Sequence, residues 1–429
     1  MQAAMGTANL ATGLGVDGLV ARDVAGATPG SQASHRILIA ATTGAAILSL
    51  WATVISTLVL RWYLPSVSIF SWPAALALGC GAGLSVLASN YRAVLSGLGA
   101  AREIAIGTIV AAVLSLLGAA GLAWAPPSFV AISAAVAVVP LSTMIGLGIF
   151  ALRRVPSGAA RYGDAIRDVL QIARRATIFT AAGVLPLLGQ AMVRTLAATH
   201  LTEAGLGQMQ AAAAIAAIST SVLAGTVGPV LIPQLSSAVV NKREFSTLLS
   251  QHTTFLVALY APVALIAAAA PGVVLNALYA NDFQGGAAQL GWQLAGEAVR
   301  LPVWLMATTL VVLGRGRAYF VLEFMGLTTQ FAGMLFVLPS RDPALIGMVF
   351  AASTFAQFVL ASFLLRADGF AWSAHALGRI ALLAGACCLL ATLVGSPWGT
   401  ALGLIAAAPA VVIAFRLFKN LRRHPAAEA

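Results

Sequence analysis

The stretch AQLGWQLAGEAVRLPVWLMATTLVVL, residues 288–313, decides the fold class of this chain. It is 26 residues long, and only Glu297 and Arg300 in it are charged. The hydrocarbon core of a bilayer needs about 20 mostly apolar residues per helix. The stretch therefore predicts a membrane-spanning helix that holds its two charges near its middle, where ionisable groups are costly and usually functional.

The composition of the whole chain agrees with a membrane protein. Of its 429 residues, 60% are hydrophobic and 9% are charged, whereas an ordinary soluble domain carries about 25% charged residues. The mean hydropathy is +0.93. These values exclude a soluble enzyme, a nucleic-acid-binding protein and a disordered protein. The net charge of +11 is spread in pairs between apolar blocks, a pattern that sets orientation and contact with membrane lipid, so no nucleic acid is expected as a partner.

Thirteen apolar stretches are long enough to span a bilayer, which predicts an all-α polytopic membrane protein. The first is weak, because it contains Asn9 and Asp17. The runs are rich in Ala and Leu and do not alternate, which disfavours a barrel of strands. The predicted spans are 1–20, 37–60, 72–98, 103–124, 128–152, 176–198, 204–234, 253–275, 288–313, 319–338, 344–366, 378–395 and 399–417.

The positive charges predict the orientation. If the C-terminal tail lies in the cytoplasm, alternate loops place 19 of the 24 Lys and Arg residues there, and only Arg61 and Arg341 on the opposite side. Thirteen spans would then leave Met1 outside. We therefore expect a first helix to be missing upstream of Met1, so that the plan is fourteen helices minus the first. The alternative is that the weak segment 1–20 is not a full span.

The same pattern predicts four parts of the chain. Residues 1–152 would form an N-terminal lobe and residues 176–366 a C-terminal lobe. The basic segment 153–175 between them is predicted to be a cytoplasmic linker with a short amphipathic surface helix. Residues 378–417 would add two further transmembrane helices. Two helical lobes joined by a linker are a common plan of transporters, in which the substrate path lies between the lobes.

The best candidate site is a polar stripe within 288–313. Gln289, Gln293, Glu297 and Arg300 are spaced at i, i+4, i+8 and i+11, so they share one helix face. In one interpretation, Glu297 and Arg300 pair at i,i+3 and only lock the helix. In the other, the stripe lines a water-filled cavity, where Arg300 holds an anion and Glu297 balances it or carries a proton.

Two further arginines lie inside predicted spans. Arg194 is near the outer end of span 176–198, with Gln190 one turn deeper on the same face, and Arg92 lies toward the cytoplasmic end of span 72–98. Each can either reach the interface along its flexible stem or line the cavity. A cavity holding Arg92, Arg194 and Arg300 against one glutamate would be cationic, which suits an anionic substrate such as a phosphate-bearing lipid.

The sequence contains no motif of an enzyme. It lacks the metal-binding, nucleophile and phosphate-loop signatures, and its predicted outer loops are short. Cys80, Cys387 and Cys388 lie inside apolar runs and offer neither a disulfide framework nor metal spacing. We therefore expect no enzymatic activity, no cofactor and no metal.

Four stretches carry a resemblance to a known family: LPLLGQAMVRTLAATHL (185–201), GPVLIPQLS (228–236), LGWQLAGEAVRLPVW (290–304) and GRGRAYFVLEFM (314–325). Their order resembles the bacterial flippases of lipid-linked oligosaccharides, the O-antigen and enterobacterial-common-antigen translocases of the MOP exporter superfamily. In that family, a helix with acidic and basic positions matching Glu297 and Arg300 occupies the place of residues 292–300. Arg194 matches an arginine in the first helix of the second lobe.

The resemblance implies two six-helix lobes in a V with a central cationic cavity, in the inner (plasma) membrane of a bacterium. The substrate would be an undecaprenyl-pyrophosphate-linked oligosaccharide, moved across the membrane by alternating access, and the partners would be membrane lipid and polysaccharide polymerase or assembly proteins. Two extra C-terminal spans depart from this plan and resemble the lipid II flippase of the same superfamily. Alternatives are a MATE-like multidrug or metabolite exporter, a membrane enzyme of glycan assembly, and a non-transporting component of a polysaccharide assembly complex.

Overall fold

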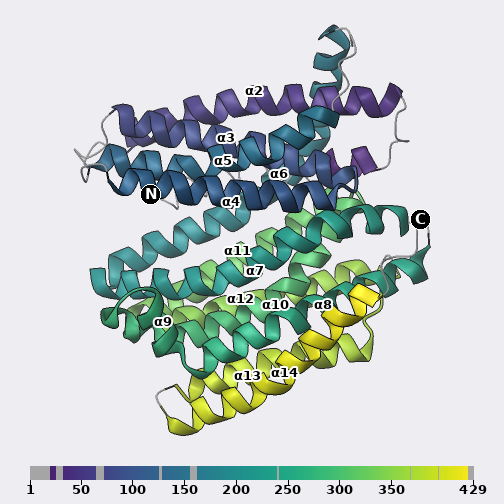
Figure 1. Ribbon diagram of the computed structural model, residues 1–429. Helices are drawn as coiled ribbons and strands as arrows, with labels where there is room; N and C mark the ends of the chain where they lie inside the picture. The colour runs from purple at the N-terminus through teal and green to yellow at the C-terminus, as the bar shows by residue number, and fades with distance from the viewer. Residues whose placement is uncertain are drawn as a thin grey trace. The chain divides into compact units, whose positions relative to one another are not determined.

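The computed structural model describes residues 20–25, 32–63, 72–124, 128–154, 162–238, 241–367, 369–394 and 396–423. The predicted span 1–20 lies outside these residues apart from its last position. All regular structure in the described part of the chain is helical (Figure 1). The elements are α2 (Gln32–Tyr63), α3 (Trp72–Gly97), α4 (Ala101–Ala123), α5 (Phe129–Arg154), α6 (Tyr162–His200), α7 (Glu203–Ala238), α8 (Lys242–Ala269), α9 (Pro271–Leu278), η1 (Asn281–Gly286), α10 (Ala287–Val312), α11 (Gly316–Val337), η2 (Leu338–Ser340), α12 (Pro343–Arg366), α13 (Ala374–Thr392) and α14 (Pro397–Arg423).

Twelve helices within the described residues are long and apolar enough to cross a membrane. They coincide in order with the twelve predicted spans that follow segment 1–20, from the span at 36–58 to the span at 398–415. Apolar side chains face outward along these helices, as expected where lipid rather than water surrounds them. Leu50, Trp51 and Leu117 are examples of such exposed side chains. The prediction of an all-α polytopic membrane protein is confirmed.

The helix ends differ from the predicted spans where polar residues extend a helix. The helix predicted to start at 176 starts at Tyr162, inside the predicted linker, and the one predicted at 253–275 starts at Lys242. Asn241 caps the latter, because its side chain accepts hydrogen bonds from the backbone N–H groups of Arg243 and Glu244. Its far end breaks at Ala270 before Pro271, which starts α9. Hydropathy detects the apolar part of a membrane helix and is blind to such polar extensions.

The chain divides into two compact units. Unit 1 comprises Met1–Leu188, Gly228–Ser237 and Leu310–Phe320, and unit 2 comprises Gly189–Val227, Ala238–Thr309 and Val321–Ala429. Helices α2 to α5 belong to unit 1, whereas α8 to α9 and α12 to α14 belong to unit 2. The two predicted lobes and the linker between them stay a prediction.

Unit 1 is built on close contacts between small residues. Helix α3 packs against α2 and α5, and α4 packs against α5. A Cβ atom added to Gly107 of α4 would lie 2.7 Å from the carbonyl oxygen of Gly146 in α5, and a Cβ on Gly146 would collide with the carbonyl oxygen of Gly107. Small residues permit such close backbone approach between membrane helices, where packing rather than water exclusion drives association.

This contact yields a first prediction. Gly146→Ala is expected to destabilise the protein by about 1–3 kcal/mol, because its methyl group must push two backbones apart. Gly121→Ala in α4 makes the same chemical change where nothing lies within 4 Å, so it should be neutral or slightly stabilising. Thermal unfolding of the two purified variants in detergent tests this expectation. Equal melting temperatures for the two variants would show that α4 and α5 can move apart without a loss of stability.

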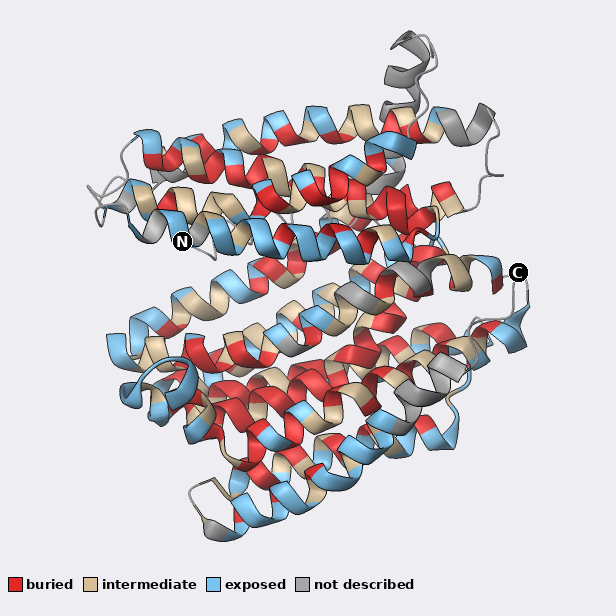
Figure 2. Ribbon diagram, in the orientation of Figure 1, coloured by how far each residue is buried: buried red, intermediate tan, exposed pale blue. Residues whose placement is uncertain are grey.

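Unit 2 surrounds α10, which is the most buried of its helices. In the most apolar window of this span, 83% of the residues are buried, compared with 56% for α8 and 33% or less for α13 and α14. Figure 2 shows this contrast between α10 and the two C-terminal helices. A core cluster joins α10 to α7, α8, α13 and α14 through residues that include Leu290, Leu294 and Tyr260. The stripe predicted on residues 288–313 therefore lies on the central helix of unit 2.

Candidate functional site

The polar stripe of α10 is deeply enclosed at three of its four positions. Gln289 is 1% exposed, Gln293 is 7% exposed and Glu297 is 2% exposed. The side chain of Arg300, at the other end of the stripe, keeps 39% of its surface exposed. The four residues thus share one helix face, as predicted, but only the guanidinium of Arg300 is open to its surroundings.

Glu297 and Arg300 form an ion pair at the i,i+3 spacing that the sequence offered. Arg300 Nη1 donates a hydrogen bond to Glu297 Oε1 at 3.2 Å. The other carboxylate oxygen, Glu297 Oε2, is buried and has no hydrogen-bond partner. A buried carboxylate with one unsatisfied oxygen costs free energy, because the lost hydration is not fully replaced. Because of this unreplaced hydration, the buried pair by itself is no evidence of a large gain in stability.

Two other helices bring further groups to Arg300. The ring of Phe350, from α12, lies 5.7 Å from the guanidinium carbon in cation–π geometry. The charge of Arg300 also acts on the carboxylate of Glu323, from α11. Gln357, from α12, donates a long hydrogen bond of 3.5 Å to Glu323 Oε2. Arg300 therefore contacts one carboxylate, Glu297, and acts on a second, Glu323, through its charge alone.

Hydrogen bonds to backbone carbonyls attach α10 to its neighbours. Gln289 Nε2 donates to the carbonyl of Met209 in α7 at 3.4 Å, while its Oε1 is buried without a partner. The hydroxyl of Tyr260, in α8, donates to the carbonyl of Leu294 at 3.2 Å. Gly347 of α12 packs against Trp292 and the backbone of Gln289. These ties fix the rotation of α10 and hence the direction in which the stripe points.

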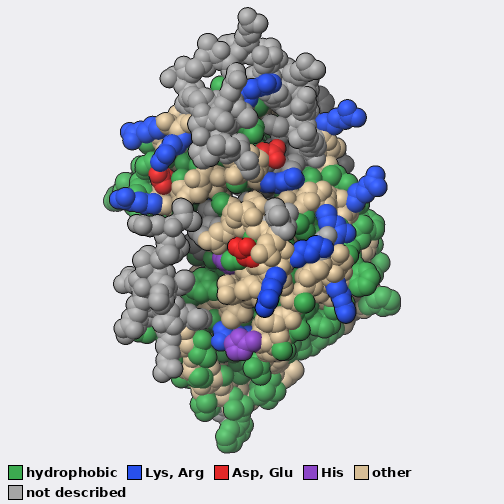
Figure 3. Space-filling model, turned by 90° about the vertical axis from the view of Figure 1, so that its right-hand side faces the viewer, with side chains coloured by type: hydrophobic (Ala, Val, Ile, Leu, Met, Phe, Trp, Pro, Cys, Tyr) green, Lys and Arg blue, Asp and Glu red, His purple; other side chains and the backbone are tan. Residues whose placement is uncertain are grey.

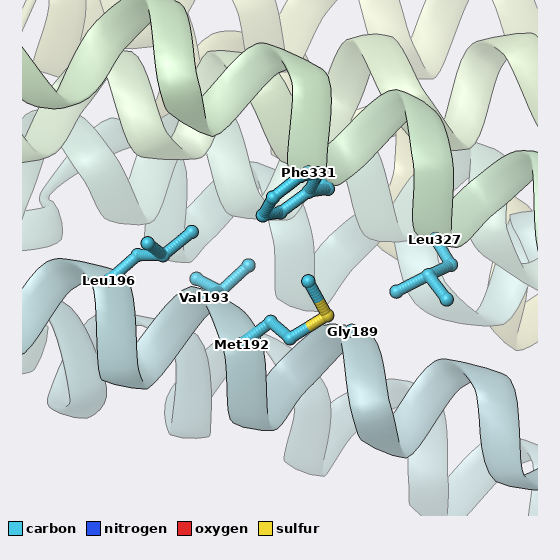
Figure 4. A pocket seen from close by; sticks show the side chains of 6 residues that line it. All are labelled: Gly189, Met192, Val193, Leu196, Leu327 and Phe331. Atoms are coloured by element: carbon cyan, nitrogen blue, oxygen red, sulfur yellow. The ribbon is translucent and has the colours of Figure 1, made fainter.

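Helix α6 presents two different faces in unit 2. Gly189, Met192, Val193 and Leu196 pack toward Leu327 and Phe331 of α11, and the crevice between them leaves no room for a water molecule (Figure 4). Gln190 is exposed and Arg194 is half-buried. Their spacing at i and i+4 places them together on a face other than the one that meets α11.

Arg194 differs from Arg300 in its partners. Among the residues that the structure describes, no acidic side chain lies within ion-pair distance of Arg194, whereas Arg300 pairs with Glu297. Arg194 is thus a cation in an apolar span, on a helix face that the packing against α11 leaves uncovered.

Arg92 belongs to unit 1 and lines a cavity there. The cavity has a volume of about 220 Å³ and is lined by Arg92 with Ser85, Ala88 and Ser89 of α3 and Val139, Pro140 and Thr143 of α5. This volume is well above the ~10–15 Å³ that holds one water molecule. The structure therefore places the seven predicted site residues in two units: Arg92 in unit 1, and Gln190, Arg194, Gln289, Gln293, Glu297 and Arg300 in unit 2. Their assignment to one substrate cavity stays a prediction.

Two groups of polar residues were missed by sequence reasoning. Glu323 and Gln357 share a hydrogen bond, and the charge of Arg300 acts on Glu323. As an acid at the start of the apolar span 319–338, Glu323 could be expected from the sequence to pair with Arg315 or Arg317, but its place near Arg300 could not. Ser85, Ser89 and Thr143 line the cavity beside Arg92. The spacing of Ser85, Ser89 and Arg92 at i, i+4 and i+7 was a signal that they share one face of α3, whereas nothing in the sequence pointed to Thr143 of α5. In the described ranges of the chain, no three His, Cys, Asp or Glu side chains are grouped to hold a metal ion.

Basic side chains are numerous on the face of the molecule drawn in Figure 3, and acidic ones are few. At neighbouring ends of α5 and α4, Arg154 Nη2 donates to Glu103 Oε1 at 2.9 Å. Such a distribution is expected where helix ends meet anionic lipid headgroups. The side of the membrane on which these residues lie remains a prediction from the positive-charge rule.

No family model matches the sequence, and no curated protein sequence matches it. Solved structures do match. A multidrug resistance MATE family transporter of the MOP superfamily, in an outward-facing conformation, matches with a TM-score of 0.61 at 15% identity, over 85% of this chain and 86% of its own. A MATE transporter of Vibrio cholerae in a bent form matches with a TM-score of 0.57 at 16% identity, over 86% and 88%.

A third match is a MOP superfamily transporter from Pyrococcus furiosus, for which a reversed polarity of the binding pocket and a different function are described. It has a TM-score of 0.59 at 15% identity, over 86% of both chains. Likeness at this identity establishes the fold and leaves the substrate open. The chain is thus a multi-pass helical membrane protein, and its fold is similar to that of MATE transporters of the MOP superfamily.

Proposed function

We propose that this protein is an exporter that moves an anionic amphiphile, a lipid-linked oligosaccharide carrying a pyrophosphate, across the bacterial inner membrane. The observation that carries the proposal is Arg194. This arginine is half-buried in an apolar span, lies on a face of α6 that is not packed on α11, and has no acidic partner within ion-pair distance among the described residues. A permanent cation in that setting is costly unless an anion meets it.

The mechanism follows from the difficulty of the step. A charged, hydrated headgroup crosses hydrocarbon slowly, because its hydration is lost there without replacement. Arg194, with Arg92 and the exposed part of Arg300, would supply fixed positive charge in place of water while the polyprenyl tail stays in lipid. Alternating access would then move the headgroup between the two sides. The protein performs no covalent step in this scheme.

A specific observation favours a second candidate, a MATE-like exporter of cations. The charge of Arg300 acts on two carboxylates of unit 2, Glu297 and Glu323, and Glu297 Oε2 lacks a hydrogen-bond partner. A proton or a cationic substrate would satisfy that oxygen. The polarity of the pocket differs among transporters of this fold, as described for the Pyrococcus furiosus protein. The fold alone therefore supports both candidates equally.

Translocation in proteoliposomes separates the two candidates. The purified chain is reconstituted with an undecaprenyl-pyrophosphate oligosaccharide, and the fraction accessible to an enzyme on the far side is measured, with a cationic drug in parallel vesicles. We expect the wild-type protein to flip the glycolipid. Arg194→Gln should lower the rate of flipping about tenfold, which corresponds to ~1.4 kcal/mol of lost interaction. Arg341→Gln changes an exposed arginine outside the apolar spans and should leave flipping unchanged.

Transport of the drug without transport of the glycolipid would overturn the proposal in favour of the cation exporter. Equal rates of flipping by the Arg194→Gln and Arg341→Gln variants would show that the Arg194 side chain only extends to the membrane interface and does not bind the substrate. Transport of neither substrate would favour a non-transporting component of a polysaccharide assembly complex.

We further propose that the C-terminus lies in the cytoplasm, because that orientation places most Lys and Arg residues on the inner side. A reporter that is active only in the cytoplasm, fused after Ala429, should be active.

A further inference from the structure

The cavity of unit 1 has the chemistry of an anion site. Arg92 and three hydroxyl-bearing residues, Ser85, Ser89 and Thr143, line it, and the remaining lining residues are apolar. No carboxylate is among the described residues that line it. A guanidinium offers five N–H donors in a planar fork that matches the oxygens of a phosphate group. Hydroxyls add donors that rotate to suit an acceptor.

The direction of the Arg92 side chain determines whether its guanidinium lies in this cavity or at the membrane surface. Arg92 precedes the end of α3 at Gly97 by five residues, or ~8 Å at 1.5 Å per residue. Long side chains on a helix lean toward its N-terminus. The stem of Arg92 therefore leans away from the nearby end of α3 and toward Ser89 and Ser85, one and two turns earlier. This direction accounts for its place in the cavity wall.

Two of the three hydroxyls donate hydrogen bonds to carbonyls of their own helices. Thr143 Oγ1 donates to the carbonyl of Val139 at 2.9 Å, and Ser85 Oγ donates to the carbonyl of Gly81 at 3.1 Å. Both carbonyls already belong to helical hydrogen-bond ladders. When such a hydroxyl turns toward an oxyanion, the carbonyl that it leaves keeps its backbone N–H donor. The hydroxyl gains a shorter, charge-assisted hydrogen bond.

We propose that the cavity between α3 and α5 binds a phosphate or diphosphate group, held by the Arg92 guanidinium and by the hydroxyls of Ser85, Ser89 and Thr143. The assignment rests on the proposed function for the source of that group, which is the pyrophosphate of the lipid-linked substrate. In this assignment the two arginines have different roles. Arg92 holds the phosphate together with the hydroxyls beside it, whereas Arg300 forms an ion pair with Glu297.

Binding is measured by calorimetry on the full purified chain in detergent with three probes: farnesyl diphosphate, inorganic pyrophosphate and farnesol. We expect farnesyl diphosphate to bind, and Arg92→Gln to weaken its binding at least about tenfold. Arg102→Gln, which removes an exposed arginine of unit 1 outside the cavity, should bind as the wild type does. Farnesol, which lacks the phosphates, should not bind detectably.

The probes also identify the source of the anion. Equal affinity for inorganic pyrophosphate and farnesyl diphosphate would indicate a site for the free oxyanion, and much weaker binding of pyrophosphate would indicate the lipid-linked form. The site is disproved if Arg92→Gln binds farnesyl diphosphate like the wild type, if farnesol binds as tightly, or if neither diphosphate binds the wild type.

Conservative variants keep the test valid if Arg92→Gln folds poorly. Thr143→Val retains the shape of the side chain and removes its hydroxyl, so it should weaken binding several-fold while leaving the melting temperature unchanged. Arg92→Lys keeps the charge and loses the planar fork, so its affinity should lie between those of the wild type and Arg92→Gln. If the protein binds farnesyl diphosphate through Arg92 but does not flip the glycolipid, this site stands and the proposed function is refuted. If Arg92→Gln flips the glycolipid like the wild type, the proposed function stands and this site is refuted.

Discussion

Arg300→Ala is expected to lower transport at least about tenfold and to destabilise the protein by about 2–3 kcal/mol. The substitution leaves the carboxylate of Glu297, which is 2% exposed, without its only ion-pair partner among the described residues. Removing one partner of a fully buried pair costs about 3–5 kcal/mol. The cost here is lower, because the Arg300 side chain is 39% exposed and its charge is partly screened by its surroundings.

A second substitution separates the two interpretations of this pair. Glu297→Gln combined with Arg300→Ala removes the uncompensated charge and should restore most of the lost stability. If Arg300 also meets the substrate, transport stays low in the double variant. If transport returns with stability, Arg300 serves only to lock α10. Thermal unfolding and flipping are measured on the same preparations.

The exposed pair of unit 1 offers a matched control. Arg154→Ala breaks the 2.9 Å ion pair with Glu103. The side chains of Arg154 and Glu103 are 58% and 27% exposed, respectively. Ion pairs at that exposure contribute little to stability, because water screens both charges. A loss of stability in Arg154→Ala as large as that in Arg300→Ala would contradict the role we give to burial.

Tyr260→Ala is expected to be the most destabilising single change, with a loss of about 3–5 kcal/mol. Tyr260 is completely buried between α8 and α10 and is among the largest enclosed side chains of the described core. Its removal leaves a cavity and frees the rotation of the central helix. Tyr260→Phe deletes only the hydrogen bond to the Leu294 carbonyl and should cost about 1 kcal/mol.

The control for this prediction is Tyr279→Ala. Tyr279 is 46% exposed and touches Phe283 with a ring separation of 5.1 Å. Its removal should cost about 0.5–1.5 kcal/mol, which is the value of an aromatic pair. Thermal unfolding compares the three variants. If Tyr260→Ala and Tyr279→Ala lose equal stability, the packing around α10 is not what holds unit 2 together.

The sequence predicted the twelve described spans because their signal is local. A run such as residues 288–313 must be a helix in a bilayer, since every backbone N–H and C=O group needs a partner inside the segment. The helix period then placed Gln289, Gln293, Glu297 and Arg300 on one face, and their spacing allowed the ion pair that the structure shows. None of these inferences required knowledge of a neighbouring helix.

The rest of the site depends on contacts between helices. Phe350 contacts Arg300, and Glu323 comes within reach of its charge, only because α11 and α12 pack beside α10, and Thr143 lies beside Arg92 only because α3 packs on α5. Small residues such as Gly347 set those approaches. Hydropathy and helix period are blind to this packing, because lipid and neighbouring helices are equally apolar to a side chain. The sequence by itself therefore determined which segments span the membrane and which polar residues share a helix face. Only the tertiary structure decided which of those residues are enclosed, which are paired and which one lines a cavity.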